Sequence, residues 1–503
     1  MAADNQADRS ATLDSIWADD LLNRREDAEL LLSFLTRRHA ERLEAGTAGA
    51  YVVNLNASWG HGKTFFMERL EQQMRAAGHL TAFVNAWRDD SSREPVVAVM
   101  AAIEDSLKPH FAKEQAAAKA WAAAKANGAT ILASIGKGAF KQLLRKGIGE
   151  GFDEVEKILN QEELVSKDVN DALETQSDKV GDAIVTEATT LLTKYVDQKI
   201  TDYQTRITGA AEFQSRMREV LATLGKKEAA KLPFFVLIDE LARCRPTYAI
   251  EMLEQVKHLF DVDNTIFLIA TDGDQLAHSI KAVYGEGFDG KRYLLRFFHR
   301  HYRLEERDTA EFVKYLFEVN RIDMSKIGTP LKSDPVALFV GAMQTYRVTL
   351  RDAEQCFDLL RSIVTTWQYK VPLELSIMLP LIIHFHRHDL EGMETYMKEN
   401  GGPLPIGSQW LIRFVEHDAY GRGKQVEVAV EGLNQALLSR SKKSLADIYE
   451  YSRGSPPATF TADVLQAEFQ KEHGNGSSHR PFSIINDYPS IVRRIGRLAM
   501  PDT

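Results

Sequence analysis

The chain alternates short apolar runs with longer segments in which apolar residues recur at helical spacing. Four runs, at 51–56, 80–85, 234–238 and 265–271, have the length and composition of buried strands. Residues 11–44, before the first run, place apolar positions on one helical face. Strands separated by helical segments are typical of a parallel sheet with helices on both faces. The sequence therefore predicts an α/β fold.

The spacing of these elements also predicts how the chain is divided. Almost no strand pattern occurs between the second and third strands, over a stretch far longer than a usual connection. We expect residues 1–104 and 229–305 to form the two halves of the sheet domain, with a helical insertion at 105–228 between them. Mainly helical patterns follow, which predict a helical lid at 306–400 and a C-terminal helical region at 401–503.

Charge is segregated within the predicted insertion. Residues 108–146 hold eight Lys or Arg against one acidic residue, whereas residues 150–182 hold eleven acidic residues against three Lys. The two halves can neutralise each other in a helical hairpin. Lys137, Lys141 and Arg145, at i, i+4 and i+8, also suit a partner helix, a nucleic-acid backbone or an anionic membrane surface. The sequence leaves these alternatives open.

Composition narrows the class of protein. The 503 residues are 44% hydrophobic and 26% charged, which is typical of a globular protein and excludes collagen-like or disordered chains. The net charge of −9 argues against general nucleic-acid binding by the whole molecule. Two cysteines, Cys244 and Cys356, cannot form a disulfide framework. Without an apolar membrane-length segment or a secretory pattern at the N-terminus, we expect a cytoplasmic location.

The segment after the first strand has the pattern of a phosphate-binding loop. Residues 57–64, Ala-Ser-Trp-Gly-His-Gly-Lys-Thr, fit G-x-x-x-x-G-K-[ST] except at Ala57, which requires a negative φ there or accepts strain. In such loops backbone N–H groups and a helix N-terminus face one anion. Lys63 would reach the β- and γ-phosphates and Thr64 would ligate Mg²⁺. The candidate nucleotide contacts are Trp59, Gly60, His61, Gly62, Lys63, Thr64 and Phe65.

The third strand ends in two adjacent acids. Asp239 and Glu240 follow an apolar run, at the carboxyl edge where α/β sheets bind ligands. We expect Asp239 to hold Mg²⁺ through water and Glu240 to polarise the attacking water, because phosphoryl transfer depends mainly on charge neutralisation and water placement. The alternative for an Asp-Glu pair alone is a solvated acidic turn.

Further candidates lie beyond these two motifs. Asp272, after the fourth strand, is either a sensor of the γ-phosphate or a helix cap. Arg296, together with Arg292 and Arg300, is expected on a basic helical face that supplies an arginine to a neighbouring subunit's nucleotide, or is simply solvated. Arg351 is a candidate sensor in the lid.

Three features have a structural interpretation beside a functional one. Asn23 and Arg24 either border the adenine or belong to a helix cap with exposed charges. Trp87 is expected to pack in the core beneath the phosphate loop. The histidines at 384, 386 and 388 lack the neighbours of a metal set and are expected to be structural.

Several of these segments together resemble the KAP P-loop NTPases, a branch of the additional-strand class with a helical insertion and a helical lid. The resemblance covers about residues 16–360 and is carried by WGHGKT at 59–64, NAW at 85–87, DELARCRP at 239–246, ATD at 270–272, YLLRFF at 293–298 and TLRD at 349–352. The chain departs from the family pattern at Ala57, Ala242 and Arg296. Many relatives carry transmembrane helices in the insertion, and this chain does not.

The motifs and the resemblance favour a Mg²⁺-dependent ATPase, since no N-K-x-D motif for guanine follows the later strands. The resemblance further implies a role in bacterial defence against phage or mobile elements, with partner proteins encoded nearby. We also expect a homo-oligomer. Two alternatives remain open: a scaffold that binds ATP with little turnover, and a motor that acts on DNA.

Overall fold

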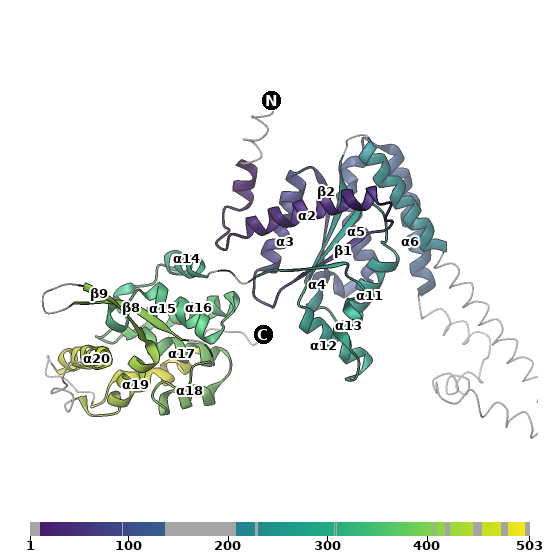
Figure 1. Cartoon of the computed structure of the whole chain (residues 1–503). Helices are drawn as coiled ribbons and strands as arrows, with labels where there is room; N and C mark the ends of the chain where they lie inside the picture. The colour runs from purple at the N-terminus through teal and green to yellow at the C-terminus, as the bar shows by residue number, and fades with distance from the viewer. Residues whose placement is uncertain are drawn as a thin grey trace, which may run out of the picture. The chain divides into compact units, whose positions relative to one another are not determined.

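The computed structural model describes residues 11–92, 94–135, 208–226, 230–305, 307, 309–405, 407, 409–417, 423–445, 455–473 and 481–497. The chain divides into two units, shown in Figure 1. The sheet unit comprises the described parts of residues 1–16, 28–56 and 67–303. The helical unit comprises those of residues 17–27, 57–66 and 304–503. The acidic half of the predicted insertion, and the end of its basic half that carries Lys137, Lys141 and Arg145, lie outside the described residues.

The described part of the sheet unit contains a five-stranded sheet, in which all neighbouring strands pair in parallel. Its order is β2-β3-β4-β1-β5. The strands are β1 (Tyr51–Asn56), β2 (His79–Asn85), β3 (Lys231–Asp239), β4 (Thr265–Thr271) and β5 (Arg300–Arg303). The predicted α/β fold and its first four strands are confirmed. In this order β4 lies between β1 and β3, so one strand separates the two that precede the candidate motifs.

Helices pack on the sheet and bury both of its faces. Alternate residues of β3, such as Phe234, Val236 and Ile238, join one apolar cluster with helices α5, α6, 208–226 and α11, while Phe235 and Leu237 are buried on the opposite face. The helical elements are α2 (Arg24–Glu44), α3 (Lys63–Ala76), α4 (Ala86–Asp89), η1 (Asp90–Ser92), α5 (Pro95–Phe111), α6 (Gln115–Ile135), a helix over 208–226, η3 (Leu241–Arg243), α11 (Pro246–His258), α12 (Gly273–Tyr284) and α13 (Gly290–Leu294). The first turns of α2 and α3 group with the helical unit.

The described ends of the predicted insertion belong to the core of the sheet unit. Trp121 of α6 and Phe213 of the helix over 208–226 are buried in the same apolar cluster as the strands. Helix α5 crosses the predicted boundary at residue 105 without a break. No helix among the described residues has both the length and the apolar character needed to cross a membrane.

The helical unit is built around α17 (Leu375–His386), which buries nine successive residues, 375–383. Helix α17 packs against α15 (Pro335–Tyr346), α16 (Leu350–Thr366), α18 (Leu390–Lys398), α19 (Val430–Ser441) and α21 (Tyr488–Gly496). Helix α14 (Ala310–Asn320) packs on α15 and α16, and α20 (Pro456–His473) packs on α19. Short elements complete the unit: η4 (Met324–Lys326), η5 (Pro330–Lys332), η7 (Ile484–Asp487) and the paired strands β6 (Ile327–Gly328) and β7 (Leu373–Glu374). The C-terminal region is not helical throughout, because β8 (Leu411–His417) and β9 (Gly423–Ala429) form an antiparallel pair.

Candidate functional site

The loop between β1 and α3 has the backbone conformation that its glycines predict. Gly60 and Gly62 adopt φ of 80° and 77°, in the left-handed region that favours glycine. Ala57, in the place of the usual first glycine, has no positive φ, so its side chain is accommodated without backbone strain of this kind. The replacement of that glycine is therefore compatible with the loop.

Lys63 begins α3 and folds back over the loop. Its ammonium donates to the carbonyl oxygens of Ala57 at 2.6 Å and Ser58 at 3.0 Å. Nδ1 of His61 lies 3.2 Å from the same Ser58 oxygen. The first turn of α3, which includes Thr64, carries no acidic residue to offset the positive end of the helix dipole. A cationic side chain and a helix N-terminus thus adjoin one short loop, the combination that binds phosphate.

Within the helical unit, the loop also packs against the start of α16. A Cβ atom on Gly60 would lie 2.7 Å from Oγ1 of Thr349, too close for any side chain. The guanidinium carbon of Arg351 lies 5.5 Å from the centroid of the Trp59 ring, within cation–π range. Arg351, predicted as a sensor, is therefore placed beside the loop, and its sensing role remains a prediction.

Hydrogen bonds connect the start of α16 to α17. The Thr349 hydroxyl caps α16 by accepting from the Asp352 N–H at 3.2 Å and donates to the Asp352 carboxylate at 2.8 Å. The same carboxylate lies 3.1 Å from Nε2 of His386. Although burial opposes the effect, the hydrogen bonds from Thr349 and His386 hold the pKa of Asp352 below its usual value. His384 likewise contacts Asp389, and the described residues contain no group of three side chains suited to a metal ion.

The segment before β1 packs on aromatic side chains in the first turn of α3. Rings of Phe65 and Phe66 each lie 6.3 Å from buried Trp17. Arg24 is only 2% exposed and donates to the Asp27 carboxylate and to the Glu305 carbonyl oxygen. The expectation of exposed charges at this cap is wrong for Arg24, because its guanidinium joins two segments of the helical unit. Asn23 is exposed, with φ of 52°; whether it contacts adenine stays a prediction.

The acidic end of β3 contains a buried carboxylate with an unused oxygen. Asp239 is 1% exposed. Its Oδ1 accepts the Glu240 N–H at 2.7 Å, whereas Oδ2 has no hydrogen-bond partner among the described residues. A buried carboxylate without a compensating partner is costly, and a hard cation such as Mg²⁺ prefers oxygen ligands. This side chain therefore fits the predicted Mg²⁺ role.

Glu240 turns the chain sharply after the strand. It adopts φ of 63°, an uncommon conformation for a residue with a side chain, and directly precedes η3. Its Oε2 forms an ion pair with Nε of Arg243. The Arg243 guanidinium carbon lies 5.1 Å from the centroid of the Trp87 ring. Trp87 is 54% exposed, so the expectation that it fills the core is wrong: its ring supports an arginine instead.

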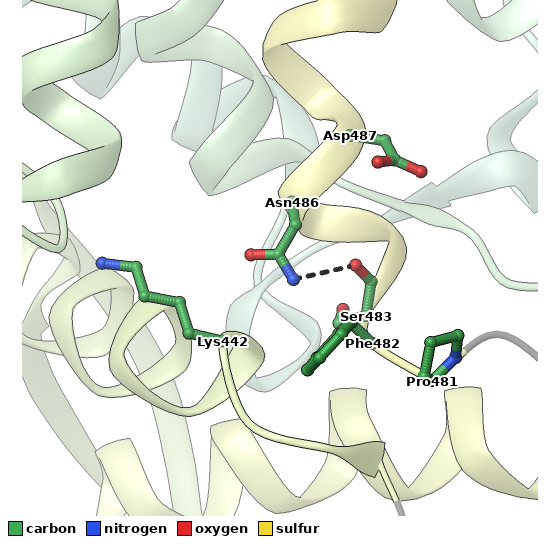
Figure 2. Close-up of a pocket in the computed structure, with 6 residues that line it drawn as sticks. All are labelled: Lys442, Pro481, Phe482, Ser483, Asn486 and Asp487. Carbon is green, nitrogen blue, oxygen red and sulfur yellow. Dashed lines mark hydrogen bonds between the residues drawn. The ribbon is translucent and has the colours of Figure 1, made fainter.

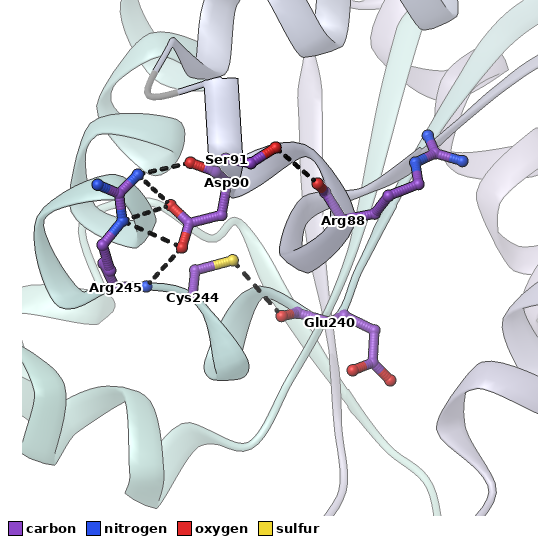
Figure 3. Close-up of polar contacts among 6 residues, drawn as sticks. All are labelled: Arg88, Asp90, Ser91, Glu240, Cys244 and Arg245. Atoms are coloured by element: carbon purple, nitrogen blue, oxygen red, sulfur yellow. Dashed lines mark hydrogen bonds and ion pairs between the residues drawn. The ribbon is translucent and has the colours of Figure 1, made fainter.

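Residues after Glu240 tie this turn to the segment after β2, as Figure 3 shows. Arg245 donates from its backbone and its guanidinium to Asp90, and these hydrogen bonds hold the pKa of the Asp90 carboxyl below its usual range. The Cys244 Sγ lies 3.6 Å from the Glu240 carbonyl oxygen. Burial raises the pKa of the Cys244 thiol to about 12, so it remains protonated and can donate there. These contacts restrain the backbone that follows Glu240.

Comparison of the sequence with models of known protein families identifies the family to which these motifs belong. A model described as the KAP family P-loop domain matches residues 37–387, which is well over half of the chain. The chain belongs to the KAP family of P-loop NTPases. Family membership implies that the chain binds a nucleotide. A comparison with curated proteins finds no significant match.

The remaining candidate residues of this KAP domain lie outside the loop and the acidic turn. Asp272 caps α12 by accepting the Gln275 N–H at 3.2 Å, and Thr271 donates to Asn54 of β1 at 2.8 Å. The predicted basic helical face is wrong. Arg292 lies in α13, Arg296 lies in the turn after that helix, and Arg300 begins β5, so the three do not share a helix.

A pocket elsewhere in the helical unit has no feature of a nucleotide site. It is lined by Lys442, Pro481, Phe482, Ser483, Asn486 and Asp487, drawn in Figure 2. Lys442 donates to Asn400 at 2.8 Å, and the Asn486 amide donates to the carbonyl oxygens of Ser441 and Ser483. These polar groups already bind one another and their neighbours, so the pocket adds nothing to the KAP motifs.

Proposed function

We propose that this protein is a Mg²⁺-dependent ATPase whose phosphate loop binds the triphosphate and whose acidic turn directs the attacking water. One observation carries the proposal. Two parallel strands of one sheet, β1 and β3, lead directly into a glycine loop with Lys63 and into a buried acid with an unused oxygen, Asp239. Carboxyl ends of parallel strands share one edge of a sheet, where such folds bind ligands.

The residues divide the chemistry between them. Backbone N–H groups of the loop and the Lys63 ammonium bind the β- and γ-phosphates, with Lys63 leaving the carbonyl oxygens that it now contacts. Thr64 and Asp239 would hold Mg²⁺, which neutralises phosphate charge when it is bound. The water oxygen bonds to the γ-phosphorus as the bond to the β–γ bridging oxygen breaks. ADP and phosphate leave, and the water proton passes by way of Glu240 to the products.

Contacts between the loop and α16 support a coupling of nucleotide state to the helical unit. Gly60 packs on Thr349, and Trp59 packs on Arg351. A phosphate that moves Lys63 and its loop also changes these contacts. We therefore assign Arg351 as the residue that reports nucleotide state to α16, and through Asp352 and His386 to α17.

The family resemblance supports the biological part of the proposal: assembly of several copies with partner proteins, in defence against phage or other mobile elements. Arg296 is exposed in the turn after α13, a place from which a side chain can reach another subunit. The test is protection of cells from phage by the wild-type gene, which Lys63→Ala must abolish at equal expression. Equal protection by both would reject a nucleotide-dependent role in defence.

A phosphate-release assay on the purified full-length protein tests the enzymatic part. We expect Mg²⁺-dependent release from ATP that exceeds release from GTP and disappears in EDTA. Tight ATP binding without release above background would favour a non-hydrolysing scaffold and overturn the proposed activity.

A further inference from the structure

Arg243 reaches the carboxylate that the proposed reaction needs. It lies three residues after Glu240 on η3, and its Nε pairs with Oε2 of Glu240. The two side chains are 28% and 11% exposed, so the pair is largely shielded from water. An ion pair with reduced solvent screening is stronger than one on the open surface. The ion pair restrains the position of Oε2 and thereby limits the conformations open to the Glu240 side chain.

Trp87, in the helix that follows β2, contacts the Arg243 guanidinium. In the sheet, Asn85 of β2 is paired with Asp239 of β3, which brings the start of α4 beside the acidic turn. Asn85 caps α4 by accepting the Arg88 N–H at 2.9 Å, which fixes the first turn that carries Trp87. The Trp87 ring lies 5.1 Å from the Arg243 guanidinium. The cation–π contact with Arg243 accounts for the position of the exposed Trp87 ring.

The backbone beneath the pair has little freedom to adjust. Asp90 binds both the N–H and the guanidinium of Arg245, and Cys244 contacts the Glu240 carbonyl oxygen (Figure 3). Glu240 itself holds a left-handed φ of 63°. Strain of this kind persists where surrounding contacts maintain it. With the main chain restrained in this way, the ion pair with Arg243 is a contact that can orient the Glu240 carboxylate.

We propose that Arg243 is a positioning residue that aims the Glu240 carboxylate at the attacking water, and that Trp87 supports Arg243 in this role. The inference rests on the proposed function of Glu240. Arg243 touches neither the nucleotide nor the water; it acts through Glu240. Its loss leaves nucleotide binding intact and lowers the rate of the chemical step, since small errors in the placement of a catalytic group are costly.

The test compares kcat and ATP affinity in Arg243 and Trp87 variants of the full-length protein. We expect Arg243→Ala to lower kcat about tenfold or more while ATP affinity changes less than about twofold. Arg243→Lys, which keeps a charge but loses the planar fork, recovers part of the rate. Trp87→Phe retains most activity and Trp87→Leu loses several-fold, because only an aromatic ring supports the cation. Arg88→Ala is the matched control, since the Arg88 side chain pairs with Asp89 on the surface, and we expect wild-type kinetics.

A double-mutant cycle excludes a merely structural role. In the Glu240→Gln background, Arg243→Ala has no further effect on kcat if Arg243 acts through Glu240. The inference would be overturned if the losses in kcat from the two substitutions multiplied in the double variant. It would also be overturned if Arg243→Ala left kcat unchanged or raised it, or if this variant lost ATP affinity together with kcat. Absence of turnover in the wild-type protein would instead reject the proposed function itself, so the two failures are distinguishable. Conserved ATP affinity in Arg243→Lys and Trp87→Phe shows that these variants are folded.

Discussion

The two candidate motifs differ in how the chain builds them. The phosphate loop is a local device of the helical unit, in which two glycines with positive φ and one lysine lie within four residues. The acidic turn belongs to the sheet unit and depends on side chains from the end of β2, Trp87 and Asp90, as well as on its own residues. The loop has the groups to bind an anion, whereas the turn has the groups to orient a carboxylate. This difference predicts that loop variants lose nucleotide binding and turn variants lose turnover.

Lys63→Ala gives the largest expected effect. Loss of a charge-assisted contact to phosphate weakens ATP binding by about 10- to 100-fold, and turnover disappears. Calorimetric titration with ATP and Mg²⁺ and phosphate release measure the two effects. Lys332→Ala, on η5 of the same unit, is the control and is expected to leave both unchanged. Normal affinity in Lys63→Ala would break the assignment of binding to the loop.

Glu240→Gln tests the acidic turn, the second of the two motifs. We expect turnover to fall about 100-fold or more, the usual contribution of a positioned acid or base, while ATP affinity stays within about twofold. Single-turnover phosphate release and ATP titration measure these quantities. Equal losses in affinity and in rate would mean that the acidic turn takes part in binding, and the contrast between the two motifs would then fail.

The two units are also expected to respond to pH in opposite ways. Burial raises the pKa of Glu374, which caps α17, to about 7. A raised acid pKa gives stability that is present below the unfolded value of 4.5 and is lost as pH rises through about 7. The full shift corresponds to about 3 kcal/mol of unfolding free energy. In the sheet unit, burial lowers the pKa of His79 to about 4, so that its stability is lost as pH falls below about 6.5.

Denaturant unfolding at pH 5 and pH 8 checks this prediction. We expect Glu374→Gln to stabilise the helical unit relative to wild type at pH 8 and to have little effect at pH 5. Glu354→Gln on α16 provides an exposed control with no such pH dependence. A wild-type helical unit that is more stable at pH 8 than at pH 5 would contradict the sign.

Gly60→Ala tests the loop with the smallest expected change. A Cβ there combines a left-handed φ with a clash against Thr349, and we expect a loss of ATP affinity of about tenfold, equivalent to 1–2 kcal/mol. Gly46→Ala has a similar φ of 63° and open space around it, so it controls for backbone strain alone. Equal ATP affinities in the two variants would show that the packing of Gly60 on α16 is unimportant.

The sequence predicts those parts of the molecule that depend on local pattern. Continuous apolar runs identify β1 to β4, and glycine spacing identifies the loop. Strand β5 is missed because Arg300–Arg303 is a short, polar edge strand with little buried surface. The β8–β9 hairpin is also missed, although apolar and polar residues alternate in Gln425 to Ala429 and provide a strand signal.

Tertiary contacts explain the remaining errors at the site. Trp87 is a large hydrophobic residue, for which burial is the default expectation, and its exposure follows from a contact with Arg243 that lies 156 positions away in the chain. The Arg243–Glu240 pair is close in sequence, but its orientation depends on the left-handed turn at Glu240. Neither feature follows from residue spacing alone.

The most direct test of the central claim is the Mg²⁺ dependence of ATP binding in Asp239→Asn. Wild-type protein is expected to bind ATP more tightly with Mg²⁺ than in EDTA, because Asp239 supplies a buried oxygen to the ion. We predict that Asp239→Asn loses this difference and binds ATP with Mg²⁺ only as tightly as wild type does in EDTA, without loss of thermal stability. A variant that keeps the full Mg²⁺ enhancement would contradict the proposed role of Asp239 as a ligand of the ion.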